Sequence, residues 1–242
     1  SISGSTFARN QTRAKFIDNQ GGALWLSGGA AVIVDCVFDG HGLGNNNPDG
    51  PTALIRLLDS GVAERCTVFA FKGAGNGGGH YHAGVILDGA NAVLRNSLVY
   101  ACSNTWKSVD SKGNRNPKYS GAGVVVKTAG GLVENCTIVN NRSGYCGAGL
   151  CFGAQGMVRN TIAWGNEAEL GFEQDIFTNG INKAVTEMCT YSCAPELTTG
   201  DGNTAADPKL RPAGKKRPYQ FGSSSPCYDT ALRLDWMDET AV

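Results

Sequence analysis

The sequence has little charge, little proline and no long apolar run. Only 17% of its 242 residues are charged, and 21 basic residues balance 21 acidic ones. A zero net charge argues against a nucleic acid or an anionic membrane surface as a partner attracted by bulk charge. No apolar run approaches the roughly 18 to 20 residues that a membrane-spanning helix needs. We therefore expect no nucleic-acid partner and no membrane span in this chain.

Glycine and cysteine, by contrast, are abundant. The 34 glycines are about twice the usual share, and with only 8 prolines the composition is neither collagen-like nor that of a disordered tract. Small residues suit tight turns between closely stacked strands. The nine cysteines are an odd number, so at least one is unpaired or pairs between chains. Cysteine use at this level points to an oxidising compartment, and we expect an extracellular or outer-surface location.

A short motif recurs along the chain and indicates a repeat architecture. It combines a polar residue, a small residue and strand-forming residues. Copies occur at 35–38, 65–68, 96–99, 135–138 and 160–163, with weaker copies at 4–7 and 188–191. The small residues of these copies, from Ser5 to Cys189, are 25 to 39 residues apart, which is within the range of solenoid repeats. The uneven interval indicates a constant core with insertions in one loop.

A second, apolar segment precedes the motif at 22–26, 53–55, 84–87, 123–126 and 149–152. These segments are too short for helices, so each unit is predicted to contain two strands, a glycine turn and a polar loop. Stacked units pair in parallel about 4.8 Å apart and bury a continuous core. The sequence predicts an all-β fold, a right-handed parallel β-helix of about six rungs, over residues 1–195. The proline-rich residues 196–242 are expected to form an irregular segment on the last rung.

Short motifs near both ends of the chain carry a family resemblance. Residues 7–10 and 16–19 read FARN and FIDN, and residues 21–24 read GGAL. They resemble the FxxN and GGA(I/L) repeats of chlamydial-type polymorphic outer-membrane proteins. Residues 206–210 (ADPKL) and 225–229 (SPCYD) are similar to the closing segment of bacterial secreted right-handed parallel β-helix proteins. The resemblance implies export and surface display, and it implies no reaction.

Three charged residues follow the first strand of consecutive units and form the sharpest chemical hypothesis. Asp59, Asp88 and Lys127 are expected to stack on one outward face about 4.8 Å apart. Two close carboxylates could hold Ca²⁺ or share a proton, and a neighbouring lysine could abstract a proton beside a uronate carboxylate. β-Helix polysaccharide lyases use groups of this kind. The alternative is that these charges are solvated side chains beside turns.

Loop residues provide the candidates for ligand binding. Insertions on one side of a repeat array are where binding residues are usually displayed. Histidines in glycine-rich loops could contact a sugar or a metal ion, and an aromatic ring in a loop could do the same for a sugar. The alternative is that they are solvated loop residues. The candidates are His41, His80, His82 and Trp106.

The cysteines and asparagines suggest structural ladders and cross-links. Cysteines at the repeated small position lack the paired CxxC spacing of a zinc site, so we expect them to stack inside the core. The cysteines concerned are Cys36, Cys66, Cys136 and Cys189. Asparagines at the neighbouring position, Asn96, Asn135 and Asn160, are expected to form an amide ladder. Cysteines outside these positions give two disulfide candidates, Cys102 with Cys146 and Cys193 with Cys227.

Two functions of different class fit these features. The favoured one is a non-catalytic extracellular or cell-surface module with an adhesive, scaffold or filament-forming role, whose partner could be a polysaccharide or a host surface. The alternative is a polysaccharide-active enzyme, a lyase or a glycoside hydrolase, that works on the strand face. Apart from Ca²⁺ at Asp59 and Asp88, no cofactor is expected.

Both ends of the chain have the appearance of a piece of a longer polypeptide. The first motif copy lacks its preceding strand, and the last residues carry no turn signal that would close a domain. An uncovered end of a strand stack recruits further strands unless a cap intervenes. We therefore expect the N-terminal end to be covered by upstream rungs or by another copy stacked end to end.

Overall fold

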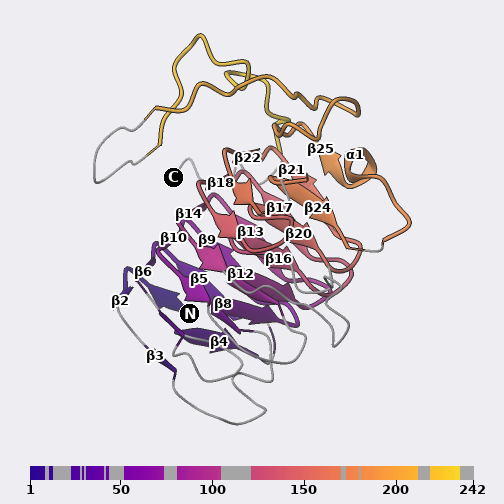
Figure 1. The fold of residues 1–242 in the computed structure, drawn as a ribbon. Helices are drawn as coiled ribbons and strands as arrows, with labels where there is room; N and C mark the ends of the chain where they lie inside the picture. The colour runs from indigo at the N-terminus through magenta and orange to yellow at the C-terminus, as the bar shows by residue number, and fades with distance from the viewer. Residues whose placement is uncertain are drawn as a thin grey trace.

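The computed structural model describes residues 1–8, 11–12, 23–27, 29, 31–40, 42–43, 52–73, 81–104, 121–169, 173–179, 181–211 and 219–234. This part of the chain is nearly all β (Figure 1), and its one helix, α1 (Val185–Met188), is four residues long. Its strands form four parallel sheets, which we name A to D in the order in which the chain enters them.

The strands of each sheet are short, and neighbours in a sheet are four strands apart in the sequence. Sheet A contains β1 (Ile2–Ser3), β5 (Val32–Val34), β9 (Val62–Glu64), β13 (Val93–Arg95), β17 (Leu132–Glu134), β21 (Met157–Arg159) and β25 (Cys189–Thr190). Sheet B contains β2 (Thr6–Ala8), β6 (Val37–Asp39), β10 (Thr67–Phe69), β14 (Leu98–Tyr100), β18 (Thr137–Val139) and β22 (Ile162–Trp164). Sheet C contains β3 (Gln11–Thr12), β7 (Gly42–Leu43), β11 (Lys72–Gly73), β15 (Ser103–Asn104), β19 (Arg142–Ser143) and β23 (Glu167–Ala168). Sheet D contains β4 (Leu24–Leu26), β8 (Thr52–Leu58), β12 (His82–Asp88), β16 (Val124–Val126), β20 (Leu150–Phe152) and β24 (Ile176–Thr178).

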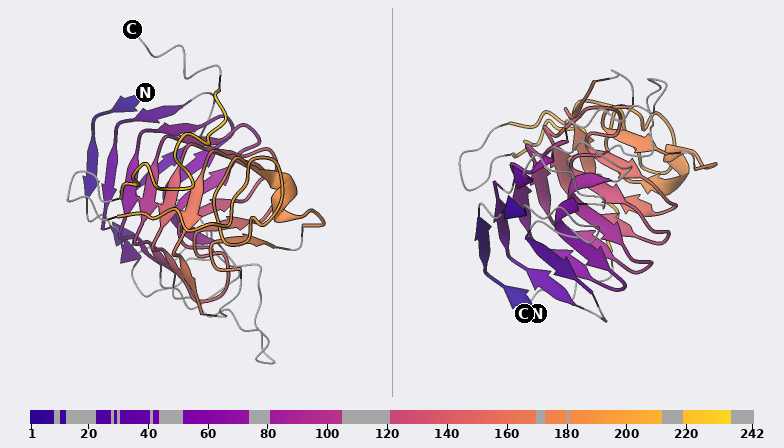
Figure 2. Two further views of the ribbon diagram at one scale, coloured as in Figure 1. Left: turned by 90° about the horizontal axis from the view of Figure 1, so that it is seen from above. Right: turned by 60° about the horizontal axis from the view of Figure 1, so that its bottom comes forward.

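Four consecutive strands, one from each sheet, form a layer, and successive layers stack on one another. The first layer is β1–β4 and the sixth is β21–β24. Each strand pairs in parallel with the equivalent strand of the adjacent layers, as β10 does with β6 and β14. Figure 2 shows the layers following one another along a single axis. The predicted all-β fold with stacked parallel strands is confirmed.

Each layer contains four strands where the sequence motif predicts two. Residues 96–99 were expected to be one strand, but Asn96 has φ +51° and Ser97 is a buried corner residue, so that β14 begins only at Leu98. The strands that the motif did not reveal belong to sheets A and C. They have two or three residues each, too few for an alternating pattern to show.

From the second layer onward, two corners of each layer share one geometry, in which a left-handed residue is followed, where the structure describes it, by a buried residue. Between sheets A and B, φ is +49° to +55° at Asp35, Arg65, Asn96, Asn135 and Asn160. Between sheets B and C, φ is +52° to +67° at Gly40, Ala70, Ala101, Asn140 and Gly165. Glycine and asparagine adopt this conformation at low cost, which explains the asparagines of the repeated motif.

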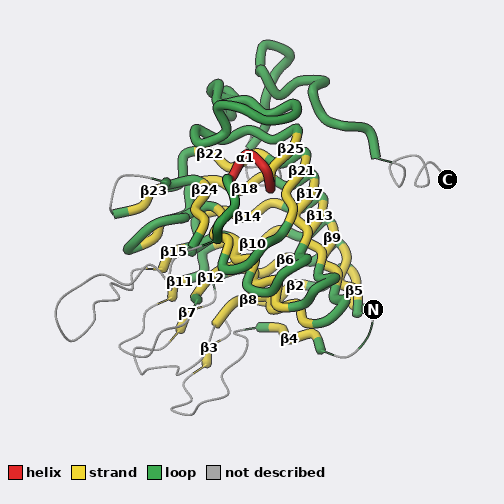
Figure 3. Tube along the Cα trace, turned by 90° about the vertical axis from the view of Figure 1, so that its right-hand side faces the viewer, coloured by secondary structure: helices red, strands yellow, loops and turns green. Residues whose placement is uncertain are grey.

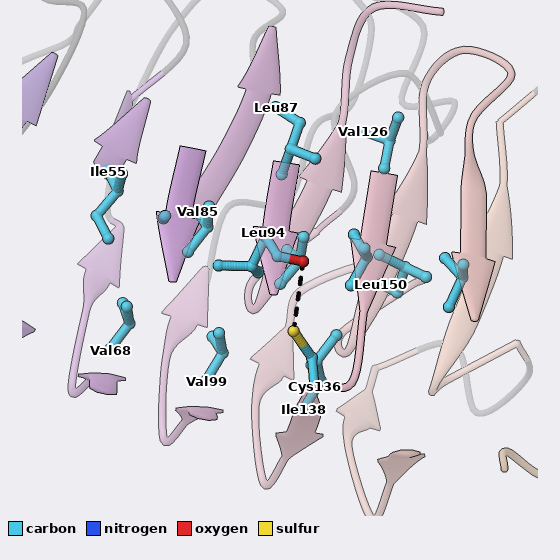
Figure 4. Packing of buried hydrophobic residues seen from close by; sticks show 14 of the residues in the cluster. Ile55, Val68, Val85, Leu87, Leu94, Val99, Val126, Cys136, Ile138 and Leu150 are labelled. Atoms are coloured by element: carbon cyan, nitrogen blue, oxygen red, sulfur yellow. Dashed lines mark hydrogen bonds between the residues drawn. The ribbon is translucent and has the colours of Figure 1, made fainter. Parts of the chain in front are cut away.

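Inward-facing side chains of the stacked strands form a continuous hydrophobic core (Figure 4). Val68 and Val99 lie opposite each other on β10 and β14, and Ile55 and Val85 do so on β8 and β12. All four are 0% exposed. Burying a side chain of this size contributes roughly 1.5 to 3 kcal/mol, so repetition of the same contact through the layers stabilises the stack.

The corner between sheets A and B carries a buried ladder of thiols and hydroxyls. Cys36 and Cys66 are 1% and 2% exposed and lie in adjacent layers, as predicted. The side chains also hold the backbone, because Cys66 N donates to Ser97 Oγ at 3.0 Å. Cys136 Sγ donates to Leu94 O at 3.6 Å, the dashed contact in Figure 4. Burial raises the pKa of the Cys66 thiol to about 11 and that of Cys136 to about 12, so both stay protonated near neutral pH.

One member of this ladder was assigned to the wrong residue. Cys189 lies in β25 and pairs with Val158 of sheet A, so it does not occupy the corner position. The corner residue is Ser192, whose Oγ accepts a hydrogen bond from Thr161 N at 3.2 Å. The preceding Tyr191 has the expected left-handed φ of +49°. A tyrosine at the position where earlier layers have asparagine or another polar residue hid the motif.

The C-terminal segment continues sheet B and then folds back along it. Cys193 bridges Ile162 on one side and Thr204 on the other, both in parallel. Farther on, Tyr219 packs edge-on against Tyr100 with ring centroids 5.6 Å apart. Figure 3 shows this segment as loops at the end of the stack that carries α1. Residues from 196 onward therefore contact the fourth layer as well as the last one.

Candidate functional site

The charged cluster around Asp88 is the closest counterpart of the predicted strand-face site. Asp88 ends β12, and Lys127 and Thr128 follow β16 in the next layer. Lys127 Nζ lies 2.7 Å from Asp88 Oδ2, and Thr128 Oγ1 donates to Oδ1 at 2.7 Å. Arg56 of β8 donates to Oδ2 through Nε at 2.9 Å. Both oxygens of Asp88 are thus held by donors from the two neighbouring layers.

The electrostatics of Asp88 follow from these donors. Burial by itself raises the pKa of this carboxyl, but the hydrogen bonds from Lys127, Thr128 and Arg56 outweigh it and leave the pKa below its ordinary value. The Asp88 and Arg56 side chains are 9% and 8% exposed, so water screens the pair little. Asp88 is therefore an ionised, fully ligated anion, a poor proton acceptor and a poor metal ligand.

Asp59 does not join this cluster in the way the sequence indicated. Asp88 lies opposite Leu58 in the pairing of β12 with β8, one residue short of Asp59. Asp59 itself occupies the turn after β8, with φ +51° and an exposed side chain. The strand pairing therefore does not place the two carboxylates opposite each other. The pair that was expected to hold Ca²⁺ or share a proton is not formed by this pairing. With Asp88 already neutralised by two cations, these donors do not fit Ca²⁺.

The loop candidates have different outcomes. His41, His80 and Trp106 lie outside the described residues. His82 is the first residue of β12 and is 1% exposed, so it is part of the packed interior and not a solvated loop residue. A β-carbon on Gly73 would come within 3.1 Å of the His82 Cβ. Such close packing, which the alternation of His80 and His82 could not reveal, removes His82 from the ligand-accessible surface.

A second charged row, which sequence reasoning missed, runs along the outer face of sheet A. Glu64, Arg95, Glu134 and Arg159 occupy the same strand position in consecutive layers. Arg95 Nη2 lies 2.7 Å from Glu64 Oε2, and Arg159 Nη2 lies 2.7 Å from Glu134 Oε2. The signal was available, because each residue directly precedes the polar residue of the repeated motif. Alternation of sign through the layers makes this row a structural ladder.

A buried polar ladder runs inside the corner between sheets B and C and ends at a carboxylate. Asn141 Oδ1 accepts from Cys102 N at 2.9 Å, and Asn166 Oδ1 accepts from Asn141 N at 2.9 Å. Asp175 Oδ1 then accepts from Asn166 N at 2.9 Å and from its Nδ2 at 2.6 Å. Asp175 is 4% exposed. A charged group thus ends a ladder whose other side chains are neutral amides.

A second carboxylate faces Asp175. Glu196 Oε1 accepts from Asp175 N at 3.1 Å, and Glu196 Oε2 is buried without a hydrogen-bond partner among the described residues. Burial, reinforced by the negative charge of Glu196, raises the pKa of Asp175 to about 6 against the opposing hydrogen bonds from Asn166. Burial and Glu196 also raise the pKa of the exposed Glu173. This end of the stack therefore holds its protons at higher pH than ordinary carboxyls.

A pocket of about 210 Å³ lies between the corner of sheets A and B and the C-terminal segment. Its polar side chains are mostly engaged with the protein. Asn160, for example, donates through Nδ2 to Leu232 O at 2.7 Å and accepts from Leu232 N at 2.8 Å. The expected amide ladder is therefore confirmed between Asn135 and Asn96, at 3.3 Å, but Asn160 binds the C-terminal segment instead. Cys193 and Cys227 also line the pocket.

The four cysteines named as disulfide candidates are thiols in the structure, like the other five. Cys193 and Cys227 lie close enough for each thiol to shift the pKa of the other. Cys102 belongs to the main core, and its Sγ donates to Tyr100 O at 3.6 Å. Cys146 packs with Cys151 in a second cluster on the other face of sheet D. The Cys102–Cys146 bridge stays a prediction.

Within the described part of the chain, no group of three or more His, Cys, Asp or Glu side chains could hold a metal ion. The same residues include no helix long and apolar enough to cross a membrane. A scan against protein-family models found no match, and searches of curated proteins and of solved structures also found none. A functional proposal must therefore come from the chemistry of the sites themselves.

Proposed function

We propose that this chain is a non-catalytic module of an extracellular or cell-surface protein, a right-handed parallel β-helix of six rungs with an adhesive or scaffold role. The observation that carries the proposal is the Asp88 cluster. The charged residues on the strand face, where a polysaccharide-active enzyme would place its catalytic groups, bind one another. The six stacked layers support the β-helix architecture, and the sequence resemblance described above supports export.

The alternative, a uronate-polymer lyase, conflicts with the state of these groups. A lyase base must present a free lone pair to the proton beside the uronate carboxylate. The ammonium of Lys127 lies 2.7 Å from the ionised Asp88, and a cation held there donates hydrogen bonds and does not accept a proton. Arg56 is likewise bound to Asp88 and is 6% exposed. The cluster therefore stabilises the strand face, and none of its own groups is positioned for elimination.

The proposal is tested by incubating the intact chain with uronic-acid polymers and following the ultraviolet absorbance of unsaturated uronate ends. We expect no product from the wild type. The Asp88→Asn variant should lose about 1.5 to 3 kcal/mol of unfolding free energy, because the hydrogen bonds of Arg56 and Lys127 lose their charged acceptor. Product formation by the wild type, abolished in a folded Lys127→Gln variant, would refute the non-catalytic proposal and establish the lyase.

A scaffold role includes binding of a partner at one end of the stack. The two ends of the described stack differ in how well they are covered. The apolar residues Ile2, Phe7, Leu24 and Leu26 of the first layer are only half-buried, whereas the equivalent side chains of the second layer are 0% exposed. Among the described residues, no strand pairs with the outer edges of β1–β4. At the opposite end, α1 and the segment around Cys193 pack on the last layer. We propose that the first layer binds another copy of the chain or preceding rungs.

We expect sedimentation of the purified chain to show concentration-dependent association. Leu26→Glu should weaken it at least tenfold, because a carboxylate would have to be buried at the apolar end. Met157→Glu is the matched control, since Met157 is 51% exposed on the side of the stack, and it should leave association unchanged. A wild-type chain that stays monomeric at every concentration would contradict the stacking proposal.

A further inference from the structure

Cys193 and Cys227 come from distant parts of the chain and meet at the pocket beneath the C-terminal segment. Cys193 belongs to the strand extension that bridges Ile162 and Thr204, and it is 2% exposed. Cys227 lies in the C-terminal segment and is half-buried. The two thiols lie close enough for each to shift the pKa of the other. Both line the pocket of about 210 Å³, so a small molecule has a path to the pair.

The environment makes the two thiols unequal. The interactions with Cys193 and with the Ser225 hydroxyl outweigh burial and hold the pKa of Cys227 below that of an ordinary thiol. The same contact with Cys227, together with burial, raises the pKa of Cys193. Cys193 Sγ also lies 3.3 Å from Ala206 O. Cys227 is thus the readier thiolate and the more accessible sulfur, which are the two requirements of an attacking cysteine.

We propose that Cys193 and Cys227 form a redox-active dithiol, in which Cys227 attacks a low-molecular-weight disulfide and Cys193 resolves the mixed disulfide. This goes beyond the proposed scaffold role, because it assigns a chemical reaction to the pocket. The pocket lining contains hydroxyl, amide and aromatic side chains, among them Tyr191 and Phe221, and no charged residue among those described. A small neutral disulfide therefore fits it best.

The reaction balances with that disulfide as the oxidant. The Cys227 thiolate attacks one sulfur of the small disulfide, so that a mixed disulfide forms and one small thiolate leaves with the electron pair. Cys193 then loses its proton to solvent or to the departing thiolate and attacks the Cys227 sulfur. A second small thiol is released. Two protein thiols are oxidised to one disulfide, and one small disulfide is reduced to two thiols.

The product would fix the C-terminal segment on the stack. In the thiol form this segment is held by contacts such as the two hydrogen bonds between Asn160 and Leu232 and the edge contact between Tyr219 and Tyr100. A covalent link between residues 193 and 227 closes the intervening chain into a loop and removes freedom from the unfolded state. We expect oxidation to raise the Tm by roughly 5 to 10 °C in a domain of this size.

The test uses the full chain, first reduced and freed of reductant, then exposed to the neutral probe 2-hydroxyethyl disulfide and analysed by peptide mass spectrometry. The wild type should form the Cys193–Cys227 bridge. Cys193→Ser should stop at a stable adduct on Cys227, because the resolving thiol is missing. Cys227→Ser should leave Cys193 unmodified, because Cys193 is the less exposed thiol and its pKa is raised. Cys151, which is 0% exposed and does not line the pocket, serves as the internal control and should stay a thiol throughout.

Three results would overturn the proposal. The first is a Cys227 adduct in Cys193→Ser that forms no faster than modification of Cys151. The second is a wild-type chain that accumulates the mixed disulfide without forming the bridge. The third is adduct formation at Cys193 in Cys227→Ser, which would reverse the two roles. Since both serine variants retain the strand contacts of the segment, near-wild-type Tm values in the reduced state confirm that each variant is folded.

Discussion

Replacing Asn166 with leucine is expected to lower the unfolding free energy by about 4 kcal/mol, because one amide satisfies several buried groups. Its Nδ2 donates to Asp175 Oδ1 at 2.6 Å and to Ile138 O at 2.9 Å. Its Oδ1 accepts from both Asn141 N and Asn141 Nδ2 at 2.9 Å. Leucine is similar in size but makes none of these bonds. Each buried group left without a partner costs about 1 to 3 kcal/mol, so the loss exceeds that of an ordinary substitution.

Urea unfolding followed by circular dichroism measures this effect. The matched control is Glu167→Gln, at the next residue, whose side chain is 65% exposed and lies 4.0 Å from Arg142. That variant should stay within about 0.5 kcal/mol of the wild type, as exposed pairs contribute little. If Asn166→Leu proves as stable as Glu167→Gln, the internal polar ladder contributes nothing to the fold.

Replacing Asp175 with asparagine is expected to stabilise the protein above pH 6 and to have little effect below pH 4. The pKa of Asp175 is about 6 in the folded state, above its ordinary value. A raised pKa means that the folded chain holds the proton more tightly than the unfolded chain does. The stability that this proton provides is fully present below the unfolded pKa and is lost as pH rises through the folded pKa. The full difference corresponds to about 3 kcal/mol.

The asparagine variant removes this dependence without removing the contacts. Its Oδ1 can still accept from Asn166 N and Nδ2, and its neutral amide carries no charge for Glu196 to repel. We therefore expect the difference in unfolding free energy between variant and wild type to rise between pH 4 and pH 6 and then to level off. Asp175→Ala, which loses the acceptor, should be less stable than the asparagine variant at every pH. A difference that is flat across this range would show that Asp175 titrates normally.

The repeated motif was sufficient to predict the stacked parallel strands. The repeat is recognisable within this one sequence, because Cys36, Cys66 and Cys136 recur at intervals that a stack of layers explains. The motif gave the wrong position where the residue type at a corner differs from that of the earlier layers. Tyr191 replaces the usual polar residue, so the last copy was placed three residues early, at Cys189 and not at Ser192. Only two of the four strands in each layer were predicted, because strands of two or three residues are too short to show an alternating pattern.

The site was predicted less completely than the fold, for a reason of register. Asp88 and Lys127 were expected together and are in contact, since both directly follow strands of sheet D. Arg56 was missed because it stands inside an apolar strand, where a single outward polar residue looks like ordinary alternation. Asp175 was missed because it lies only nine residues after Asn166. The preceding members of the polar ladder, Asn141 and Asn166, are a full repeat apart. Contacts such as Tyr219 with Tyr100 depend on the path of the C-terminal segment, which carries no repeat.

The two left-handed corners decide where this molecule can accept foreign sequence. From the second layer onward, two residues separate the strands at these corners. The first has positive φ, and the second is buried wherever the structure describes it. A peptide inserted at either corner would shift the following strands out of register with the adjacent layers. The passage from sheet C to sheet D already varies, with eight residues between β11 and β12 but nineteen between β15 and β16. Epitopes or binding loops inserted on that side would be displayed at the spacing of the layers, on a frame that keeps its own geometry.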